Sequence, residues 1–258
     1  MLHSHFAYYL SAMSIGAGVG FLSGLFGKGG SAITTPLLRV LLNTPRFFAL
    51  ASPLPATLPT TASASWAYRG QDLVDWHAVA VTCLWGLPAT TLGSLATDWV
   101  GGHPLMILTA LFITYLGAVL LWKSERDKKE GLLQSGRAHR RKLAAIASGV
   151  GFLSGLLANA GGVLYGPLFI SWVDMPTKRA LATSLIVSCF LAIPGTIAHW
   201  YLGHIDWTLV LALSVATIPM SYIGADLALK MKSAALLKLY GAGLFLFGLY
   251  DLIHTLRL

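Results

Sequence analysis

The stretch GVGFLSGL occurs at residues 18–25 and again, letter for letter, at residues 149–156. When the chain is shifted on itself by 131 positions, further residues match without a gap, and most of them are prolines and glycines. The matches are Gly30 with Gly161, Pro36 with Pro167, Pro45 with Pro176, Ala49-Leu50-Ala51 with Ala180-Leu181-Ala182, Asp75-Trp76 with Asp206-Trp207, Pro88 with Pro219, Gly93 with Gly224, and Gly117 with Gly248. Because proline and glycine fix backbone shape, this agreement predicts two copies of one backbone design.

The composition is typical of a membrane protein. Hydrophobic residues make up 55% of the 258 residues and charged residues only 11%, whereas soluble domains carry about 25% charged residues. Apolar segments fall five to each copy, near 6–26, 30–43, 47–67, 77–98 and 104–122, then near 143–158, 161–173, 178–202, 207–229 and 234–256. Several reach the roughly 20 residues that a helix needs to cross a bilayer. Since helices are the default spanning form, we predict an all-α polytopic membrane protein.

Basic residues are concentrated in one loop. Eight of the eighteen Lys and Arg residues lie in residues 123–142, between the two copies. A basic loop beside apolar segments is typical of the cytoplasmic side of a membrane, so the net charge of +8 does not predict a nucleic-acid partner. We therefore divide the chain into a first transmembrane repeat (1–122), a cytoplasmic linker (123–142) and a second transmembrane repeat (143–258).

Five segments per copy is an odd number, so the second copy should enter the membrane from the opposite side. Alternation from a cytoplasmic linker puts most Lys and Arg residues inside and leaves only Arg39, Arg46 and Arg257 outside, as the positive-inside rule expects. Inverted-topology repeats are a recurrent plan of secondary transporters, whose substrate site lies at the midplane. We expect a multi-pass protein of the bacterial inner membrane with both termini in the periplasm.

The second segment of each copy, 30–43 and 161–173, is short and follows a glycine cluster, FGKGGS or LANAGG. Glycine weakens a helix, so we expect broken or re-entrant helices here; whether they cross the membrane fully stays open. Glycine also lets the backbone N–H groups that open a helix approach an anion. Candidate substrate-binding residues are Lys28, Gly29, Gly30 and Ser31 in the first copy and Asn159, Gly161 and Gly162 in the second. Lys28 would attract the anion, or alternatively would extend to the cytoplasmic surface as a topology marker.

The third segments are the most polar. ASPLPATLPTTASASWAYRG at 51–70 combines three prolines with many hydroxyls, and its counterpart is ATSLIVSCFLAIPGTIAHWYLG. Such a helix should lie against its repeat partner rather than against lipid. Thr57, Thr60, Ser184 and Ser188 are candidates to bind an oxyanion by neutral hydrogen bonds; the alternative is that these hydroxyls satisfy carbonyls freed by proline.

Titratable residues follow the third segments. His199, Tyr68 and Arg69 could support proton coupling, because histidine titrates near neutral pH; interfacial capping and salt bridges are the alternative. The ten acidic residues lie in loops or near segment ends, which favours an anionic over a cationic substrate. Metal motifs are missing and Cys83 and Cys189 are isolated, so we expect no metal, no cofactor and no disulfide.

In and just before GVGFLSGL, Gly16, Gly20 and Gly24 are spaced four apart, and so are Gly151 and Gly155 in the second copy. Small residues at this spacing let two helices approach closely in a membrane, and we favour such packing over contact with a ligand.

The first copy contains three stretches in order: GFLSGLFGKGGSAITTPLL, then ALAS, then a polar segment closed by YRGQDLVDW. In this pattern the chain resembles the TauE/SafE family of membrane anion exporters. The second copy repeats the pattern as GFLSGLLANAGGVLYGPLFI, ALATS and HWYLGHIDW, so the resemblance covers nearly all of the chain outside the linker. It implies a secondary transporter, not an enzyme, that moves sulfite or an organosulfonate such as sulfoacetate outward using protons. Lys28 and Ala158-Asn159-Ala160 depart from the family's glycine pattern.

Two alternatives remain at this stage. The chain could take up thiosulfate or another reduced-sulfur anion with Cys189 as a contact, or it could be a non-transporting membrane scaffold or enzyme. The expected partners are a small anion, protons as coupling ion and the lipid bilayer, and formation of a homodimer is left open.

Overall fold

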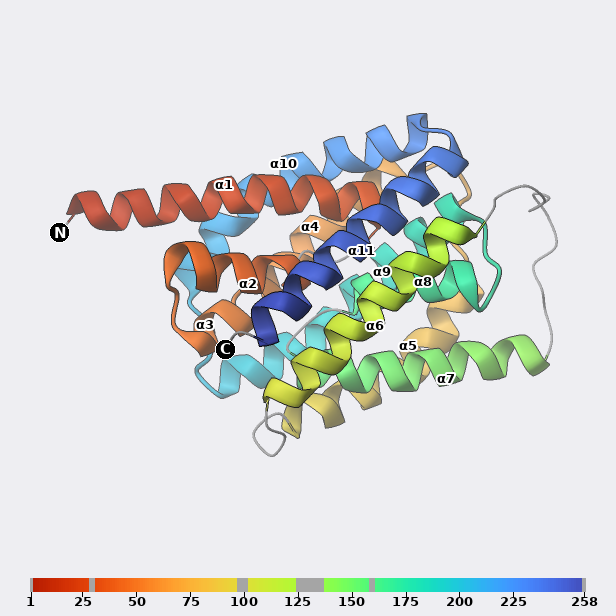
Figure 1. The fold of residues 1–258 in the computed structure, drawn as a ribbon, viewed down its shortest axis with the longest axis horizontal. Helices are drawn as coiled ribbons and strands as arrows, with labels where there is room; N and C mark the ends of the chain where they lie inside the picture. Colours follow the sequence, from red (N-terminus) through yellow and green to blue (C-terminus); the bar gives the residue numbers. More distant parts are fainter. Residues whose placement is uncertain (1, 28–30, 97–101, 124–136, 158–160, 257–258) are drawn as a thin grey trace.

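The structure, a computed structural model, describes residues 2–27, 31–96, 102–123, 137–157 and 161–256, and within these ranges it contains helices and no strands. The helices are α1 (Leu2–Phe26), α2 (Ser31–Leu42), α3 (Arg46–Ala51), α4 (Pro53–Ala67), α5 (Trp76–Leu95), α6 (Gly102–Trp122), α7 (Arg137–Leu156), α8 (Gly162–Ser171), α9 (Thr177–Tyr201), α10 (Trp207–Lys230) and α11 (Ser233–Leu256). Figure 1 shows them as one bundle, in which α1 and α7 begin at opposite ends. The all-α prediction is confirmed, although α7 begins inside the predicted linker.

Gly20 and Gly24 of the octapeptide, and their counterparts Gly151 and Gly155, lie at helix crossings. A Cβ atom on Gly24 of α1 would stand 2.8 Å from the backbone nitrogen of Ala225 in α10, and one on Gly155 of α7 would stand 2.7 Å from that of Ser94 in α5. Since 24 and 155, and likewise 94 and 225, differ by 131, the second crossing repeats the first with the copies exchanged. The predicted packing role of these glycines is thus confirmed, and each copy supplies one helix to each crossing.

Hydrogen bonds at two helix starts follow the same rule. Asp75 and Asp206 are the N-caps of α5 and α10, and their carboxylates accept bonds from N–H groups of the first helical turn. Each cap in turn donates its own backbone N–H, at 3.0 Å, to a hydroxyl of the other copy: Asp75 to Thr183, and Asp206 to Ser52. Ser52 and Thr183 again differ by 131, so the two copies are joined by matched pairs of contacts.

The second segments form short helices. With 12 and 10 residues, α2 and α8 are about 18 and 15 Å long, well short of the roughly 30 Å hydrocarbon core. The third segments differ between the copies, because Pro53 starts a new helix, α4, after the short α3, whereas α9 runs unbroken over the corresponding residues.

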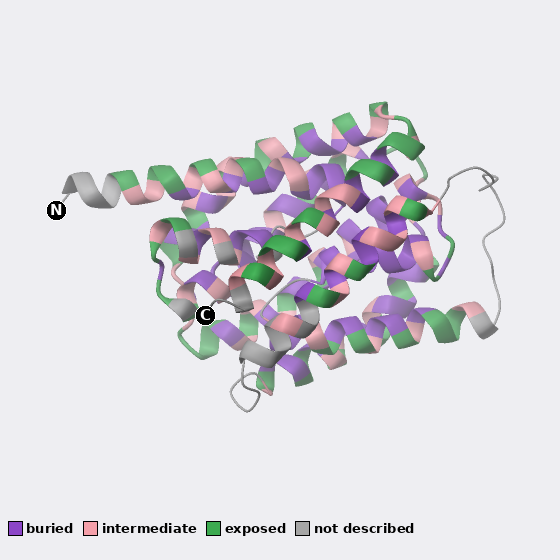
Figure 2. Cartoon of the chain, in the orientation of Figure 1, coloured by how far each residue is buried: buried purple, intermediate pink, exposed green. Residues whose placement is uncertain are grey.

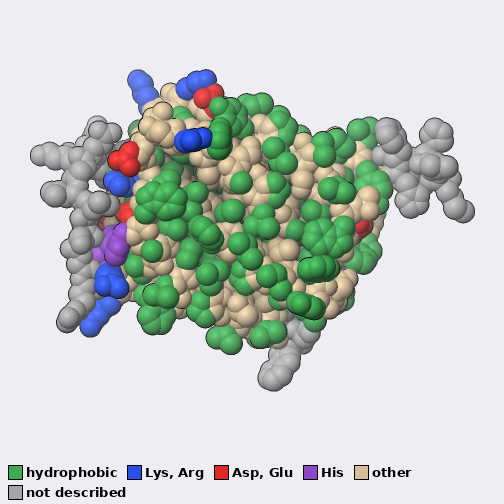
Figure 3. All heavy atoms as spheres, turned by 180° about the vertical axis from the view of Figure 1, so that it is seen from behind, with side chains coloured by type: hydrophobic (Ala, Val, Ile, Leu, Met, Phe, Trp, Pro, Cys, Tyr) green, Lys and Arg blue, Asp and Glu red, His purple; other side chains and the backbone are tan. Residues whose placement is uncertain are grey.

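The outside of the bundle is apolar. Five of the described helices, α1, α5, α9, α10 and α11, contain spans that are long and apolar enough to cross a membrane. Buried residues concentrate where helices face one another, and exposed residues lie on the outer faces (Figure 2). Figure 3 shows hydrophobic side chains across the middle of one face, while Lys and Arg gather toward one end. This distribution fits a multi-pass membrane protein with charged ends.

Candidate functional site

A small pocket lies where the first copy meets α10 of the second. Its residues come from four helices, and half of them are threonines. They are Val19 of α1, Thr34 of α2, Pro53, Ala56, Thr57 and Thr60 of α4, and Leu213 and Thr217 of α10. We call this set the threonine pocket. Its lining contains no ionisable side chain, so any polar solute in it would be bound by neutral hydroxyls and by the backbone.

The hydroxyls of the threonine pocket form a compact network. Thr60 Oγ1 lies 2.6 Å from the carbonyl oxygen of Ala56 and 2.7 Å from Thr217 Oγ1. Thr57 Oγ1 donates to the carbonyl of Pro53 at 3.0 Å. One hydroxyl proton serves only one acceptor at a time, so Thr60 and Thr217 share their protons between alternatives. Either proton can turn to an anion at the expense of one weak intramolecular bond.

These bonds bear on the proposed repair of proline kinks. The carbonyl that Pro59 leaves without its helical donor is that of Pro55, four residues earlier. The described threonine hydroxyls of α4 instead bond the carbonyls of Pro53, Ala56, Thr57 and Leu58. The threonines at 57 and 60 therefore do not serve the carbonyl freed by Pro59.

Polar side chains also fasten α4 to α10. Ser63 donates to the carbonyl of Ile218 at 2.7 Å, and Ser221 donates to the carbonyl of Thr60 at 2.9 Å. On another side, α4 packs against α9, where the place of a Cβ on Gly195 is 2.7 Å from Leu54. As predicted, the polar third segment of the first copy lies against the second copy.

The predicted glycine-turn residues are only partly described. Lys28, Gly29, Gly30 and Asn159 lie outside the described residues, and Ser31 is the first residue of α2. Gly27, which precedes the turn, has a φ of +61°, and a Cβ there would stand 2.6 Å from the Cα of Leu181. Its conformation and its close contact with α9 both require glycine.

Ser184 and Ser188 do not line the threonine pocket. Ser184 donates to the carbonyl of Gly27 at 2.6 Å and is also bonded to the carbonyl of Leu181 at 2.9 Å, so it holds the end of α1. Ser188 is fully buried, and its hydroxyl has no hydrogen-bond partner among the described residues. Gly161 caps α8 with a φ of +69°, and Gly162 is the first residue of that helix.

The three residues predicted for proton coupling are not brought together. The ring of His199 is buried, with its Nδ1 3.4 Å from Nδ1 of His204, whose ring stacks on Phe47. Tyr68 instead packs in another cluster with residues of α9 and α10, and burial raises the pKa of its phenol, which therefore stays protonated at neutral pH. Arg69 is exposed and lies over the ring of Trp66.

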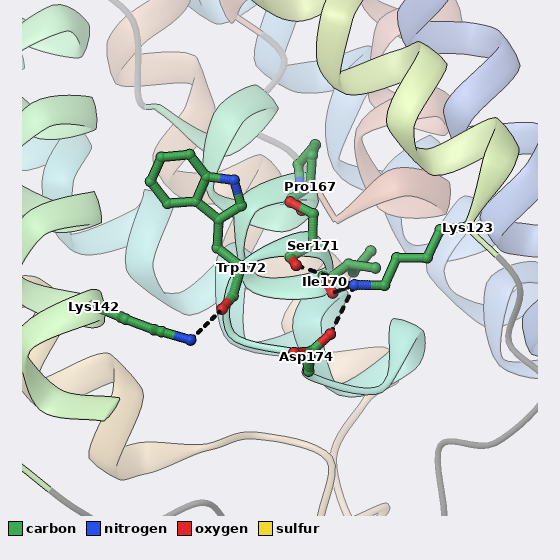
Figure 4. A network of polar contacts seen from close by, with 7 residues as sticks. All are labelled: Lys123, Lys142, Pro167, Ile170, Ser171, Trp172 and Asp174. Carbon is green, nitrogen blue, oxygen red and sulfur yellow. Dashed lines mark hydrogen bonds and ion pairs between the residues drawn. The ribbon is translucent and has the colours of Figure 1, made fainter. Parts of the chain in front are cut away.

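A lysine fixes the far end of α8. Lys123, which follows α6, donates to the carbonyls of Ile170 and Ser171 at 2.9 and 3.1 Å and pairs with Asp174 at 2.8 Å (Figure 4). Lys142 reaches the carbonyl of Trp172 from α7 at 3.4 Å. Carbonyls at a helix C-terminus lack helical partners, so these bonds cap α8 and join it to its neighbours.

Two threonines of the pocket, Thr34 and Thr217, were not among the predicted site residues, and neither were its four apolar residues. Thr34 lies three residues after Ser31, in the first turn of the helix that follows the glycine turn, and that position was the available signal. Thr217 belongs to the fourth segment of the second copy, and its proximity to Thr60 depends on the crossing of α4 and α10.

Comparisons with known proteins identify the family of the chain. The sequence profile described as "Sulfite exporter TauE/SafE" matches residues 12–250. The chain is 27% identical to a "Probable membrane transporter protein" of Xylella fastidiosa over 86% of both chains. It is 23% identical to the "Probable membrane transporter protein YunE" of Bacillus subtilis, over 91% of this chain and 93% of that one. No solved structure matches it. The chain is a multi-pass membrane transporter and belongs to the TauE/SafE sulfite exporter family.

Proposed function

We propose that this transporter moves a small sulfur oxyanion, sulfite or an organosulfonate such as sulfoacetate, out of the cell across the inner membrane, coupled to protons. The observation that carries the proposal is the threonine pocket, in which four hydroxyls converge between the two copies. Hydroxyl protons and the N-terminal end of α2 offer hydrogen bonds and a positive dipole to an anion. A lining without carboxylates spares the anion from repulsion.

In this mechanism the two copies are inverted repeats that rock against each other around the pocket. The crossings of α1 with α10 and of α7 with α5 are close-packed contacts between helices of different copies, so in this mechanism the two copies move relative to each other across these glycine contacts. Lys28, just ahead of α2, draws the anion toward the pocket from the cytoplasmic side. The candidate for proton transfer is the contact between the buried ring of His199 and the half-buried ring of His204, whose Nδ1 atoms are 3.4 Å apart.

Cys189, which the alternative of thiosulfate uptake requires, is not part of the threonine pocket. Its sulfur lies 4.0 Å from the carbonyl of Leu58, at the contact between α4 and α9. Leu58 and Cys189 are themselves 131 positions apart, so this contact joins equivalent points of the two copies.

The test is flux of radiolabelled sulfite, sulfoacetate, thiosulfate and a small carboxylate in proteoliposomes, with and without a pH gradient. Thr60→Val keeps the shape of the side chain but removes the hydroxyl, and we expect it to lower sulfite or sulfonate flux about tenfold or more, as the loss of one hydrogen bond to a charged group does. Lys28→Ala should abolish flux while leaving folded protein in the membrane.

The matched control is Thr91→Val. Thr91 makes the same kind of bond, to the carbonyl four residues earlier at 2.9 Å, but on an exposed face of α5. It should retain wild-type flux, as should Cys189→Ser. Equal flux in Thr60→Val and Thr91→Val would remove the threonine pocket from the transport path. Loss of thiosulfate flux in Cys189→Ser would favour the alternative, and absence of flux for every anion would favour a scaffold.

A further inference from the structure

The threonine pocket has a counterpart in the other half of the bundle. The residues 131 positions away from its lining are Thr82 and Gly86 of α5, Val150 of α7, Tyr165 of α8, and Ser184, Val187, Ser188 and Leu191 of α9. We call this set the image site. At least three of its members meet in space, because a Cβ on Gly86 would lie 3.0 Å from Leu191 and 3.4 Å from the hydroxyl oxygen of Tyr165.

Tyr165 fills the image site. It takes the place of Thr34, its ring is fully buried, and its hydroxyl reaches the backbone carbonyl of Ala147 at 3.3 Å. That distance is at the long end for a hydrogen bond between a hydroxyl and an oxygen. The ring stands on the first turn of α8, directly after the left-handed Gly161. The aromatic plug is thus attached at the glycine turn, where the backbone has most freedom to rotate.

Two hydroxyls of the image site are buried without a hydrogen-bond partner among the described residues. Thr82 and Ser188 are both fully buried, and neither hydroxyl has a hydrogen-bond partner among the described residues. The counterpart of Ser188 in the threonine pocket, Thr57, does donate to a carbonyl. Buried hydroxyls without partners are costly, and native proteins satisfy most of them. Thr82 and Ser188, at the positions of Leu213 and Thr57, thus leave two donors in the filled image site that are free to bind a ligand in another conformation.

We propose that the image site is a second binding position for the same oxyanion, which Tyr165 closes in the present conformation. The proposal rests on the proposed function. During transport each half would adopt the conformation that the other half has in this structure. The threonine pocket then closes, and Tyr165 moves away from Gly86 and opens the image site. The anion then receives hydrogen bonds from Thr82 and Ser188, and the substrate occupies two related positions in sequence rather than one fixed point.

The decisive experiment is the binding stoichiometry of radiolabelled sulfite to the full chain in lipid nanodiscs. Wild type should bind one sulfite per chain. Tyr165→Thr copies Thr34, opens the image site and should raise the number to two, whereas Tyr165→Phe keeps the ring and should leave it at one. Adding Ser188→Ala to Tyr165→Thr should return it to one. One sulfite in Tyr165→Thr would overturn the second position alone, while none in either protein would overturn the proposed function as well.

A second measurement decides the question if Tyr165→Thr does not fold. Ser188→Ala removes only an unpartnered hydroxyl and should leave the single equilibrium site and its affinity unchanged while lowering flux about tenfold or more. The control is Thr196→Val on the same helix, which also carries a buried hydroxyl without a partner in the described structure but lies outside the image site. We expect wild-type flux from it. Wild-type flux in Ser188→Ala, or an equal loss in both variants, would overturn the proposal.

Discussion

The threonine pocket and the image site are formed by equivalent positions of the two copies, but the first is an open pocket and the second is filled by the ring of Tyr165. In the first, Thr34 faces a space that Thr217 also lines, and both side chains are of medium size. In the second, the corresponding pair is Tyr165 and Gly86, a large residue against one with no side chain, and the ring fills the space. The exchange is compensated, since the missing side chain at Gly86 makes room for the tyrosine. This exchange, together with Leu191 in the place of Thr60, distinguishes the filled half of the duplicated protein from the half that holds a pocket.

The largest effect is expected where the halves do not differ. Gly24→Ala or Gly155→Ala would place a methyl group against backbone atoms of the facing helix, 2.8 Å or less away, and backbone cannot move aside as a side chain can. We expect either variant to lose at least about 3 kcal/mol of stability, the upper end for overpacking, and to give little monodisperse protein. Thermal unfolding in detergent and gel filtration measure this.

The chain provides a matched pair of controls for the glycine crossings. Gly18 and Gly149 belong to the same octapeptide and also differ by 131, but a Cβ on either would meet nothing within 4 Å. Alanine there should be neutral or slightly stabilising, because alanine is the better helix former by about 1 kcal/mol. If Gly18→Ala were as harmful as Gly24→Ala, close packing would not be the reason for the repeated glycines.

The next largest effect tests whether the glycine at position 86 makes room for the ring of Tyr165. Thr34→Tyr with Thr217→Gly copies the image site into the threonine pocket. We expect the double variant to fold, because the glycine leaves space for the ring, and to lose flux about tenfold or more, because the ring occupies the pocket. Sulfite flux in proteoliposomes and thermal unfolding measure the two outcomes separately.

Thr34→Tyr alone sharpens this comparison. The ring then meets the side chain of Thr217, so the single variant should be less stable than the double by about 1–3 kcal/mol, the usual cost of overpacking. Thr34→Ser keeps the hydroxyl and serves as the control with near wild-type flux. A double variant that transports normally would show that the substrate does not pass through the threonine pocket.

Much of this fold could be predicted from the sequence, because glycine and proline act on the backbone locally. Gly24 and Gly155 predict close crossings, and Pro53 accounts for the break between α3 and α4. The candidate site was harder to predict from the sequence than the fold. Ser184 is a good candidate as a hydroxyl in a polar segment, but its acceptor is the carbonyl of Gly27, 157 residues away. Whether a hydroxyl binds substrate or backbone depends on such distant partners, which no local pattern reveals.

The smallest effect concerns the far ends of the two short helices. Asn43 after α2 and Asp174 after α8 are equivalent left-handed residues, with φ of 48° and 57°. Asp174 pairs with Lys123, and the position 131 residues after Lys123 is His254, which stacks on Tyr250 of the same helix. The short helix of the second copy, α8, thus has a charged cap from Lys123.

Lys123→Met keeps most of the apolar stem but removes two hydrogen bonds to carbonyls and one ion pair. We expect the free energy of unfolding to fall by about 2 kcal/mol, in line with hydrogen bonds that involve a charged donor, and thermal unfolding measures the change. Asp174→Asn copies Asn43, tolerates the left-handed conformation and removes only the ion pair, whose carboxylate side chain is 57% exposed. It should therefore cost less than about 1 kcal/mol. If the two variants were equally destabilised, the ion pair rather than the capping of α8 would hold this end of the helix, and the two copies would differ there in charge alone.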